Sequence, residues 1–214
     1  MSQQRYKYPR TNHLPFSEGL TDGDKRMISD ECFQNKHIVI TEKMDGENTT
    51  IYNDGCHARS IDSTHRDYHS WLLSYIQNFM YQIPDNCRIC GEYLYAKHSI
   101  PYKDLISYFE VFSVWEDDVC KDWRYTEKVC KDLGLHTVPV LYEGTYQRDM
   151  VLAIAQDTVS RGCEGIVVRY SGEFELKDWE SNIAKYVRKN HVQTDEHWSQ
   201  GKIETNRLRK GADE

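Results

Sequence analysis

The sequence has 214 residues, of which 39% are hydrophobic, a net charge of −7 and seven cysteines. This length is ample for one buried core and scarcely enough for two full domains, so we expect a single domain over residues 1–214. The negative charge disfavours a protein that coats nucleic acid by electrostatics alone, and the lack of an apolar leader or of a run of about 18 apolar residues predicts a soluble, intracellular (cytoplasmic) protein with no membrane association.

The first part of the chain is expected to change from irregular structure to strands near His37. Prolines and glycines within residues 1–30 predict a largely irregular segment. Short β-branched stretches then predict a β-meander in which Lys43 stands at a strand end. Its strands are expected over residues 37–43, 49–52 and 56–61.

The rest of the chain alternates between helical and strand-like patterns. Apolar residues spaced three and four apart predict helices over residues 68–80, 122–133 and 149–160. Strand-like runs occupy residues 88–96, 107–115, 165–170 and 182–187. Strands joined largely by meanders, with interspersed helices, predict an α+β domain with antiparallel sheets. A short polar tail is expected over residues 193–214.

Three local features have less weight. Cys87-x-x-Cys90 has the spacing of metal ligands, but no second pair exists, so we expect buried, reduced thiols rather than a zinc site. Basic residues gather in the first ten positions and again at Arg207, Arg209 and Lys210. Such runs are usually solvated surface, although they are available for local contact with a polynucleotide.

The segment around Lys43 carries the most chemical information. A lysine there leaves a strand and enters a loop that contains Asp45 and Gly46. Such a lysine is a candidate nucleophile once it has lost its proton, so we expect other cationic groups to converge on the same pocket. A bare K-x-D-G match is also typical of an exposed strand end and a plain turn, and the two readings are separated by the segments that follow.

Those segments occur in a fixed order along the chain. They are Lys43-x-Asp45-Gly46, Arg59, Gly91-Glu92, Phe109-Glu110-Val111-Phe112, Glu164-Gly165-Ile166-Val167-Val168 and Lys185. This order resembles the covalent nucleotidyltransferase superfamily of DNA ligases, RNA ligases and mRNA capping enzymes, and within it RNA ligases most closely. The resemblance spans about residues 5–192, and the opening YPRTNHLPFSEG and closing NHVQTDEHW look like a subgroup of stand-alone RNA ligases.

The resemblance implies a fold and a set of roles. The fold is a nucleotidyltransferase domain, the ATP-grasp-like adenylation domain of ligases, with two antiparallel sheets, flanking helices and an ATP pocket between the sheets. Lys43 would attack the α-phosphate of ATP, displace pyrophosphate and carry AMP through a phosphoramidate bond. Glu42 would approach the adenine edge, and Arg59 would meet a phosphate as a fixed cation.

Three further residues take roles by the same resemblance. Glu92 would accept a hydrogen bond from a ribose hydroxyl or help to hold a metal ion. Phe112 would stack on adenine, with Phe109 as the alternative. Glu164 would hold Mg²⁺ or Mn²⁺ against the triphosphate.

The last motif departs from the family pattern. Lys185 would neutralise charge on the α-phosphate and help to lower the pKa of Lys43. The family often has two lysines separated by one residue, whereas here Lys185 is followed by Tyr186, Val187 and Arg188, so Arg188 is our candidate for its partner. Ser113 also replaces the aspartate that commonly follows the stacking phenylalanine.

The expected function is ATP-dependent RNA ligation with Mg²⁺ or Mn²⁺. The substrates would be RNA ends, a 5′-phosphate and a 3′-hydroxyl, with DNA or a hybrid duplex as another possible partner. The alternatives are an ATP-dependent DNA ligase and an inactive nucleic-acid-binding module of the same fold. The presence of Lys43, Glu164 and Lys185 disfavours the inactive module, because a mere binder would not need all three.

Overall fold

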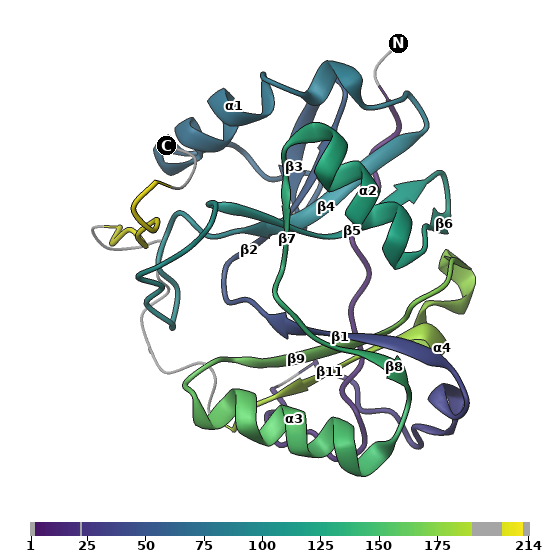
Figure 1. Cartoon of the computed structure of the whole chain (residues 1–214). Coiled ribbons are helices and arrows are strands. Elements are labelled where there is room, and N and C mark those ends of the chain that lie inside the picture. The colour runs from purple at the N-terminus through teal and green to yellow at the C-terminus, as the bar shows by residue number, and fades with distance from the viewer. Residues whose placement is uncertain (1–2, 22, 190–202, 212–214) are drawn as a thin grey trace.

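The computed structural model describes residues 3–21, 23–189 and 203–211. Two β-sheets face each other and helices cover their outer sides (Figure 1). The smaller sheet has the strand order β11-β9-β1-β8, with antiparallel neighbours throughout. Its strands are β1 (His37–Lys43), β8 (Val140–Thr145), β9 (Gly165–Tyr170) and β11 (Ile183–Val187).

The larger sheet follows the order β10-β6-β5-β4-β2-β3, and β7 pairs in parallel with β5 beside this path. Its longer strands are β2 (Glu47–Tyr52), β3 (Gly55–Ala58), β4 (Cys87–Tyr93) and β5 (Phe109–Glu116). Its short strands are β6 (Val119–Cys120), β7 (His136–Thr137) and β10 (Phe174–Glu175).

The longer α-helices pack on the outer faces of the two sheets. The α-helices are α1 (Ser70–Ile76), α2 (Trp123–Leu133), α3 (Arg148–Ser160) and α4 (Trp179–Asn182), and the 3-10 turns are η1 (Glu31–Phe33), η2 (Asp67–His69), η3 (Met80–Gln82) and η4 (Leu176–Asp178). In Figure 1, α1 and α2 cover the larger sheet and α3 covers the smaller one. Within the described residues no helix combines the length and the apolar character that a membrane crossing needs.

Successive side chains along each strand of the smaller sheet point alternately toward the core under α3 and toward the cavity between the sheets. Ile38, Ile40, Ile166, Val168, Ala184 and Tyr186 pack with Val151 and Ala155 of α3 in one buried cluster. The intervening residues Thr41, Lys43 and Val167 therefore face the larger sheet. Lys185 is the register partner of Val167 and shares this face.

Several predicted elements are confirmed and two are wrong. Strands β1 and β9 have the predicted bounds, and α2 and α3 match to within one residue. The predicted meander is wrong, because β1 pairs with β8 and β9 while β2 and β3 belong to the other sheet. The predicted helix over 68–80 is broken into η2, α1 and η3. Cys87 and Cys90 are buried free thiols, as predicted.

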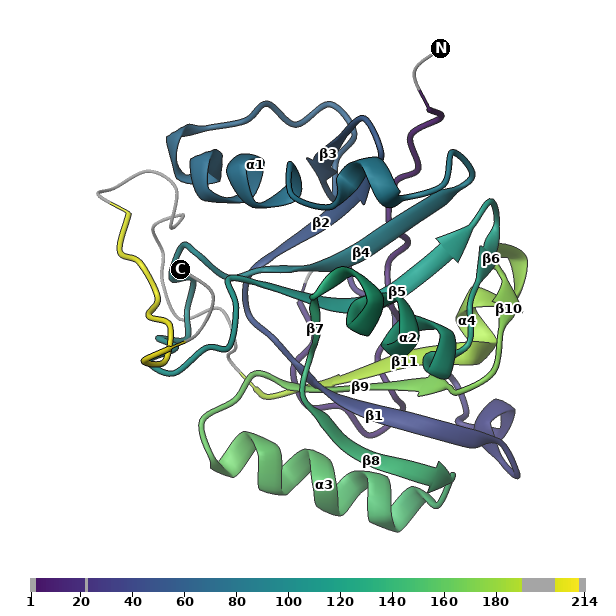
Figure 2. The same cartoon turned by 45° about the horizontal axis from the view of Figure 1, so that its top comes forward.

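Residues 203–211 lie against the connection between β4 and β5 (Figure 2). Leu208 forms a parallel bridge with Leu105, and the Asn206 side chain donates to the Leu94 carbonyl at 2.7 Å. The rest of the predicted tail, residues 193–202 and 212–214, and the whole NHVQTDEHW segment lie outside the described residues.

Candidate active site

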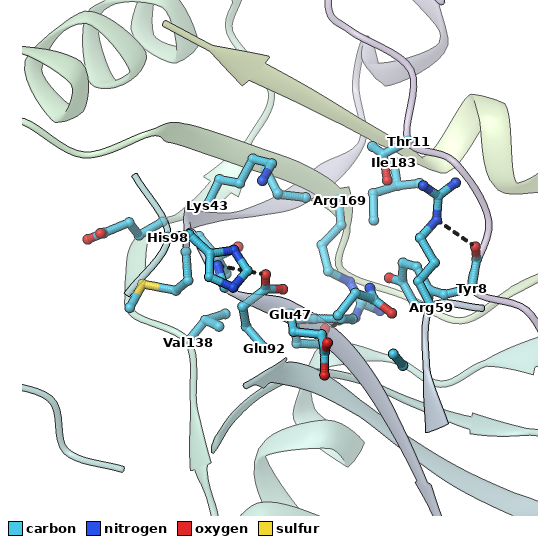
Figure 3. Close-up of a pocket in the computed structure, with 18 of the residues that line it drawn as sticks. Tyr8, Thr11, Lys43, Glu47, Arg59, Glu92, His98, Val138, Arg169 and Ile183 are labelled. Atoms are coloured by element: carbon cyan, nitrogen blue, oxygen red, sulfur yellow. Dashed lines mark hydrogen bonds between the residues drawn. The ribbon is translucent and has the colours of Figure 1, made fainter. Parts of the chain in front are cut away.

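A cavity of about 410 Å³ lies between the two sheets (Figure 3). Segments distant in sequence contribute to it, from the N-terminal stretch through β1, β2, β3, β4 and β5 to β9 and β11. The side chains that bear on its chemistry are Tyr8, Thr11, Glu42, Lys43, Arg59, Glu92, His98, Phe112, Val167 and Arg169.

Lys43 and Glu164 meet at one edge of this cavity. Lys43 is the last residue of β1, and its Nζ donates a hydrogen bond to Glu164 Oε2 at 2.7 Å. Glu164 directly precedes β9, where Gly165 pairs with Lys43. A side chain at Gly165 would place its Cβ 1.9 Å from the Tyr186 carbonyl oxygen, so only glycine allows β9 and β11 to approach this closely. The close approach fixes the Glu164 carboxylate beside the amine.

The loop after Lys43 is held by specific hydrogen bonds. Asp45 Oδ2 accepts from the Ser99 amide, the Ser99 hydroxyl and the Ile100 amide, at 2.6–2.8 Å. The Gly46 amide donates to Glu92 Oε1 at 3.1 Å. These bonds fix the path by which the chain leaves one sheet and enters the other, and they explain why Asp45 and Gly46 follow the lysine.

Carboxylates dominate the electrostatics around Lys43. Burial lowers the pKa of Lys43, but the negative charges of Glu164, Glu92 and Asp45 outweigh burial and raise the pKa overall. The expectation that cations lower the pKa of Lys43 is therefore wrong for this structure, because more acidic than basic groups converge on the amine. Burial also raises the pKa of Glu92 to about 8, against the attraction of the Lys43 ammonium.

The three predicted phosphate-binding cations lie in different surroundings. Arg59 lines the cavity, and its Nε donates to the Tyr8 carbonyl at 3.5 Å (Figure 3). Lys185 shares the cavity face of the sheet but is not among the residues that line the cavity, and its Nζ lies 3.4 Å from Asp24 Oδ1. Arg188 follows β11 and is also absent from the lining, although its amide donates to the Glu164 carbonyl at 2.9 Å.

Phe109 and Phe112, the two candidates for stacking on adenine, differ in how deeply they are buried. Phe109 is fully buried in the core beneath the larger sheet. Phe112 is half-buried, lines the cavity and meets the Tyr8 ring edge to face with centroids 5.1 Å apart. Of the two residues, only Phe112 is placed to stack on a ring bound in the cavity.

Glu42 lies at the edge of the cavity rather than in its centre. It lines the cavity, but its carboxylate accepts a hydrogen bond from the Cys163 thiol. Burial raises the pKa of Glu42, with that hydrogen bond acting in the opposite direction. Its neighbour Lys43 faces the cavity directly, as alternation along β1 requires.

Sequence reasoning missed Arg169, a buried arginine that lines the cavity. Its side chain is 3% exposed, and it donates to the carbonyls of Phe112 and Lys121 at 3.3 and 2.8 Å. The guanidinium therefore ties β9 of the smaller sheet to β5 of the larger one. A single charged residue in the otherwise apolar GIVVRY run was the available signal.

A divalent cation fits the carboxylates beside Lys43. Within the described residues, no group of three or more His, Cys, Asp or Glu side chains is arranged to hold a metal. Mg²⁺, however, commonly takes only one or two protein carboxylates and completes its shell with water and substrate phosphates. Glu164 is buried and Glu92 is half-buried, and their mutual repulsion contributes to the raised pKa of Glu92. Two such carboxylates are the hard oxygen donors that Mg²⁺ or Mn²⁺ prefers.

Comparison with known proteins gives a family match and a set of similar folds. A family model described as RNA ligase matches residues 36–187, which is well over half of the chain. An archaeal ATP-dependent RNA ligase superposes with a TM-score of 0.59 at 17% identity, covering 86% of this chain and 48% of that one. A putative ATP-dependent DNA ligase from Aquifex aeolicus superposes with a TM-score of 0.56 at 18% identity, covering 88% and 51%.

A variant of an RNA ligase from Naegleria gruberi, solved with ATP and Mn, superposes with a TM-score of 0.56 at 14% identity and covers 87% of this chain and 59% of that one. At identities this low, the superpositions show that the folds are shared and nothing more. The chain spans about half the length of the first solved structures it matches. A sequence search of curated proteins gave no match.

Proposed function

The chain belongs to the RNA ligase family, and on that premise we propose that it is an ATP-dependent RNA ligase that joins 5′-phosphate and 3′-hydroxyl ends through AMP carried on Lys43. The observation that carries the proposal is the position of Lys43. Its amine stands at a cavity of about 410 Å³ that is also lined by Phe112, Arg59 and the half-buried Glu92, and it donates a hydrogen bond to the buried Glu164.

The first step would place ATP between the sheets. Phe112 from the larger sheet supplies a ring face for adenine, and Val167 from the smaller sheet supplies an apolar surface in the same cavity. Glu42 and Arg59 also line the cavity, where Glu42 would approach the adenine edge and Arg59 would offer a guanidinium to a phosphate. This arrangement would bring the α-phosphate to Lys43.

The charged groups around the Lys43 amine would orient it and stabilise the negative charge of the triphosphate. Glu164 Oε2 accepts the hydrogen bond of Lys43 Nζ and so orients the nucleophile. A divalent cation held by Glu164, with help from Glu92, would stabilise the negative charge that develops on the triphosphate. Lys185 carries a positive charge on the same sheet face, with Asp24 as its anchor. Arg188 stays the candidate for its partner.

The remaining steps follow from the chemistry of an adenylated lysine. AMP would pass from Lys43 to a 5′-phosphate, and a 3′-hydroxyl would then attack that activated end and release AMP. DNA ligation uses the same groups, so the sugar of the substrate separates the two activities.

The experiment that tests the activity is a joining assay on labelled 5′-phosphorylated ends. Matched RNA, DNA and hybrid junctions are incubated with the protein, ATP and Mg²⁺ or Mn²⁺, and the ligated product is resolved by length. We expect joined RNA whose yield depends on ATP and on the metal. A protein that forms no joined product on any junction would contradict the proposal.

A further inference from the structure

The N-terminal segment contacts the larger sheet first and the smaller sheet next, on its way along the molecule (Figure 1). The RNA ligase family model begins at residue 36, so the residues before that position lie outside the family match. Tyr8 and Thr11 of this segment nevertheless line the active-site cavity. The segment therefore reaches the site from a part of the chain that the family pattern does not cover.

Residues 12–14 pair with β11 on both sides of Lys185. The Lys185 amide donates to the Asn12 carbonyl at 2.9 Å, and the Leu14 amide donates to the Lys185 carbonyl at 2.8 Å. This is the pattern of a parallel pair of strands, with both hydrogen bonds directed to one residue. The N-terminal segment thus extends the smaller sheet beyond β11, exactly beside the lysine whose role was inferred from the last motif.

The same extension brings Asp24 to the side chain of Lys185. His13 forms a parallel bridge with Lys185 on one side and with Arg26 on the other. Asp24 comes two positions before that second bridge, and its Oδ1 lies 3.4 Å from Lys185 Nζ. The side chains of Asp24 and Lys185 are only 18% and 17% exposed. An ion pair so placed is screened less than one at the open surface.

Further hydrogen bonds fix the Asp24 carboxylate. Its Oδ2 accepts from the Thr21 hydroxyl at 2.8 Å and lies 3.1 Å from His13 Nε2. His13 is fully buried, and its Nδ1 lies 2.9 Å from Ser17 Oγ. Ser17 Oγ in turn accepts from the Val187 amide at 3.0 Å. The network therefore starts and ends on β11, the strand that carries the lysine.

Ser17, His13 and Asp24 are connected in the order of a hydrolytic triad, but the serine is not placed to act as a nucleophile. Ser17 is 2% exposed, and its Oγ accepts a backbone amide of β11. A nucleophile has to contact its substrate, and this oxygen faces the protein interior. The network supplies a fixed carboxylate beside Lys185 and no reacting group of its own.

Asp24 opposes two effects that weaken the positive charge of Lys185. Burial lowers the pKa of Lys185, the charge of Lys43 adds to that effect, and Asp24 acts in the opposite direction. Burial also raises the pKa of Asp24, but the hydrogen bond from Thr21 and the charge of Lys185 outweigh it and lower that pKa to about 2. At neutral pH the Asp24 carboxylate is therefore ionised and faces the Lys185 amine.

We propose, on the basis of the proposed ligase function, that Asp24 is a positioning residue that holds the Lys185 ammonium for the α-phosphate of ATP. The segment that carries Asp24 then belongs to the active site, although it precedes the family-matched region. A free lysine side chain has up to about 2 kcal/mol of rotamer entropy, and Asp24 restricts that freedom before ATP binds. No bond forms or breaks at Asp24, which acts through Lys185 alone.

The first test is the rate of lysyl-AMP formation at saturating ATP. Asp24→Asn keeps the shape of the side chain and removes its charge. We expect the rate to fall roughly ten- to a hundredfold, since a misplacement of about 1 Å can cost about a hundredfold. The KM for ATP should change less, because Lys185 acts on charge that develops in the transition state.

Asp54→Asn is the matched control for this substitution. It breaks the 2.8 Å ion pair between Arg5 and Asp54, which also ties the N-terminal segment to the larger sheet, and Asp54 is exposed and outside the cavity lining. The control should keep the wild-type rate. Equal rates for Asp24→Asn and the wild type, or equal losses in Asp24→Asn and Asp54→Asn, would overturn the proposal.

A double-mutant cycle separates positioning from a merely structural role. Lys185→Met removes the ammonium and should slow lysyl-AMP formation by itself. If Asp24 acts through Lys185, Asp24→Asn has little further effect in the Lys185→Met protein. Independent roles would instead multiply the two losses, and that result would contradict the proposal. Rates are compared below the melting temperature of all four proteins, so that loss of folded protein does not enter.

Chemical labelling of Lys185 supplies a measurement that does not depend on ligase activity. Acetic anhydride acetylates neutral, accessible amines, and mass spectrometry compares Lys185 with the exposed Lys128 of α2. Asp24→Asn should speed the labelling of Lys185 and leave that of Lys128 unchanged. A wild type that forms no lysyl-AMP would contradict the proposed function. Unchanged labelling of Lys185, in a protein whose wild type does form lysyl-AMP, would contradict the role of Asp24 alone.

Discussion

The Lys43 amine and the Glu164 carboxylate form a direct hydrogen bond, with Nζ 2.7 Å from Oε2, although the two residues are 121 positions apart. The pairing of β1 with β9 creates this contact, because it places Lys43 opposite Gly165. The nucleophile proposed for the reaction and the carboxylate proposed for the metal are therefore positioned by one pair of strands.

Substitution of Glu164 should impair chemistry more than folding. We expect Glu164→Ala to slow the formation of lysyl-AMP by roughly a hundred- to a thousandfold, because a metal carboxylate and an orienting hydrogen bond are lost together. The melting curve should match that of the wild type. A variant that unfolds while its remaining folded fraction keeps full activity would show that Glu164 is structural.

Arg169 should control both stability and ATP affinity. Arg169→Met removes the donors that hold the carbonyls of Phe112 and Lys121, and each buried acceptor left unpaired costs about 1–3 kcal/mol. We expect the melting temperature to fall by about 3–10 °C and the KM for ATP to rise. Arg124→Met is the control, since that arginine is exposed. An unchanged KM would show that Arg169 does not position Phe112 for the nucleotide.

The close approach at Gly165 can be tested with a neighbouring glycine as control. Gly165→Ala forces a contact with the Tyr186 carbonyl and should destabilise the fold by about 1–3 kcal/mol while displacing Glu164. Gly162→Ala introduces a Cβ into open space, although its φ of +91° adds some backbone strain. Thermal melts should show the larger loss for Gly165→Ala, and the opposite order would contradict the packing argument.

The sequence predicted the cavity residues that lie within recognisable motifs. It missed the cavity residue whose contacts come from packing between the two sheets. Lys43 was identified because the β-branched pattern of β1 ends at the lysine, and Glu42 was identified by resemblance to the ligase superfamily. Arg169 was missed because its contacts to Phe112 and Lys121 depend on how two sheets face each other, and periodicity within one strand contains no such information.

Three other failures have equally specific causes. Strand β8 was not predicted because its residues are half-exposed and its sequence VLYEGT lacks clear alternation. The anchoring of Lys185 by Asp24 joins residues 161 positions apart, through an N-terminal segment that was expected to be irregular. The raised pKa of Lys43 could not be predicted, since it depends on how many carboxylates the fold brings together.

The sugar at the 3′ side of the junction should distinguish RNA from DNA ligation. A site built around a 2′-hydroxyl leaves a buried partner unpaired when that group is missing, at a cost of about 1–3 kcal/mol, or roughly five- to a hundredfold in rate. Pre-adenylated protein should therefore seal a ribose-ended junction faster than a junction that differs only in a terminal deoxyribose. Equal rates, or faster sealing of an all-DNA junction, would favour the DNA ligase alternative.

The site of adenylation tests the central claim most directly. The protein is incubated with ATP and Mg²⁺ or Mn²⁺, digested and mapped by mass spectrometry, beside Lys43→Ala and a Lys128→Ala control on an exposed position of α2. The account predicts one acid-labile, base-stable AMP adduct on Lys43, present in the control and absent from Lys43→Ala. An adduct on another residue, or none in the wild type with ATP and metal present, would contradict it.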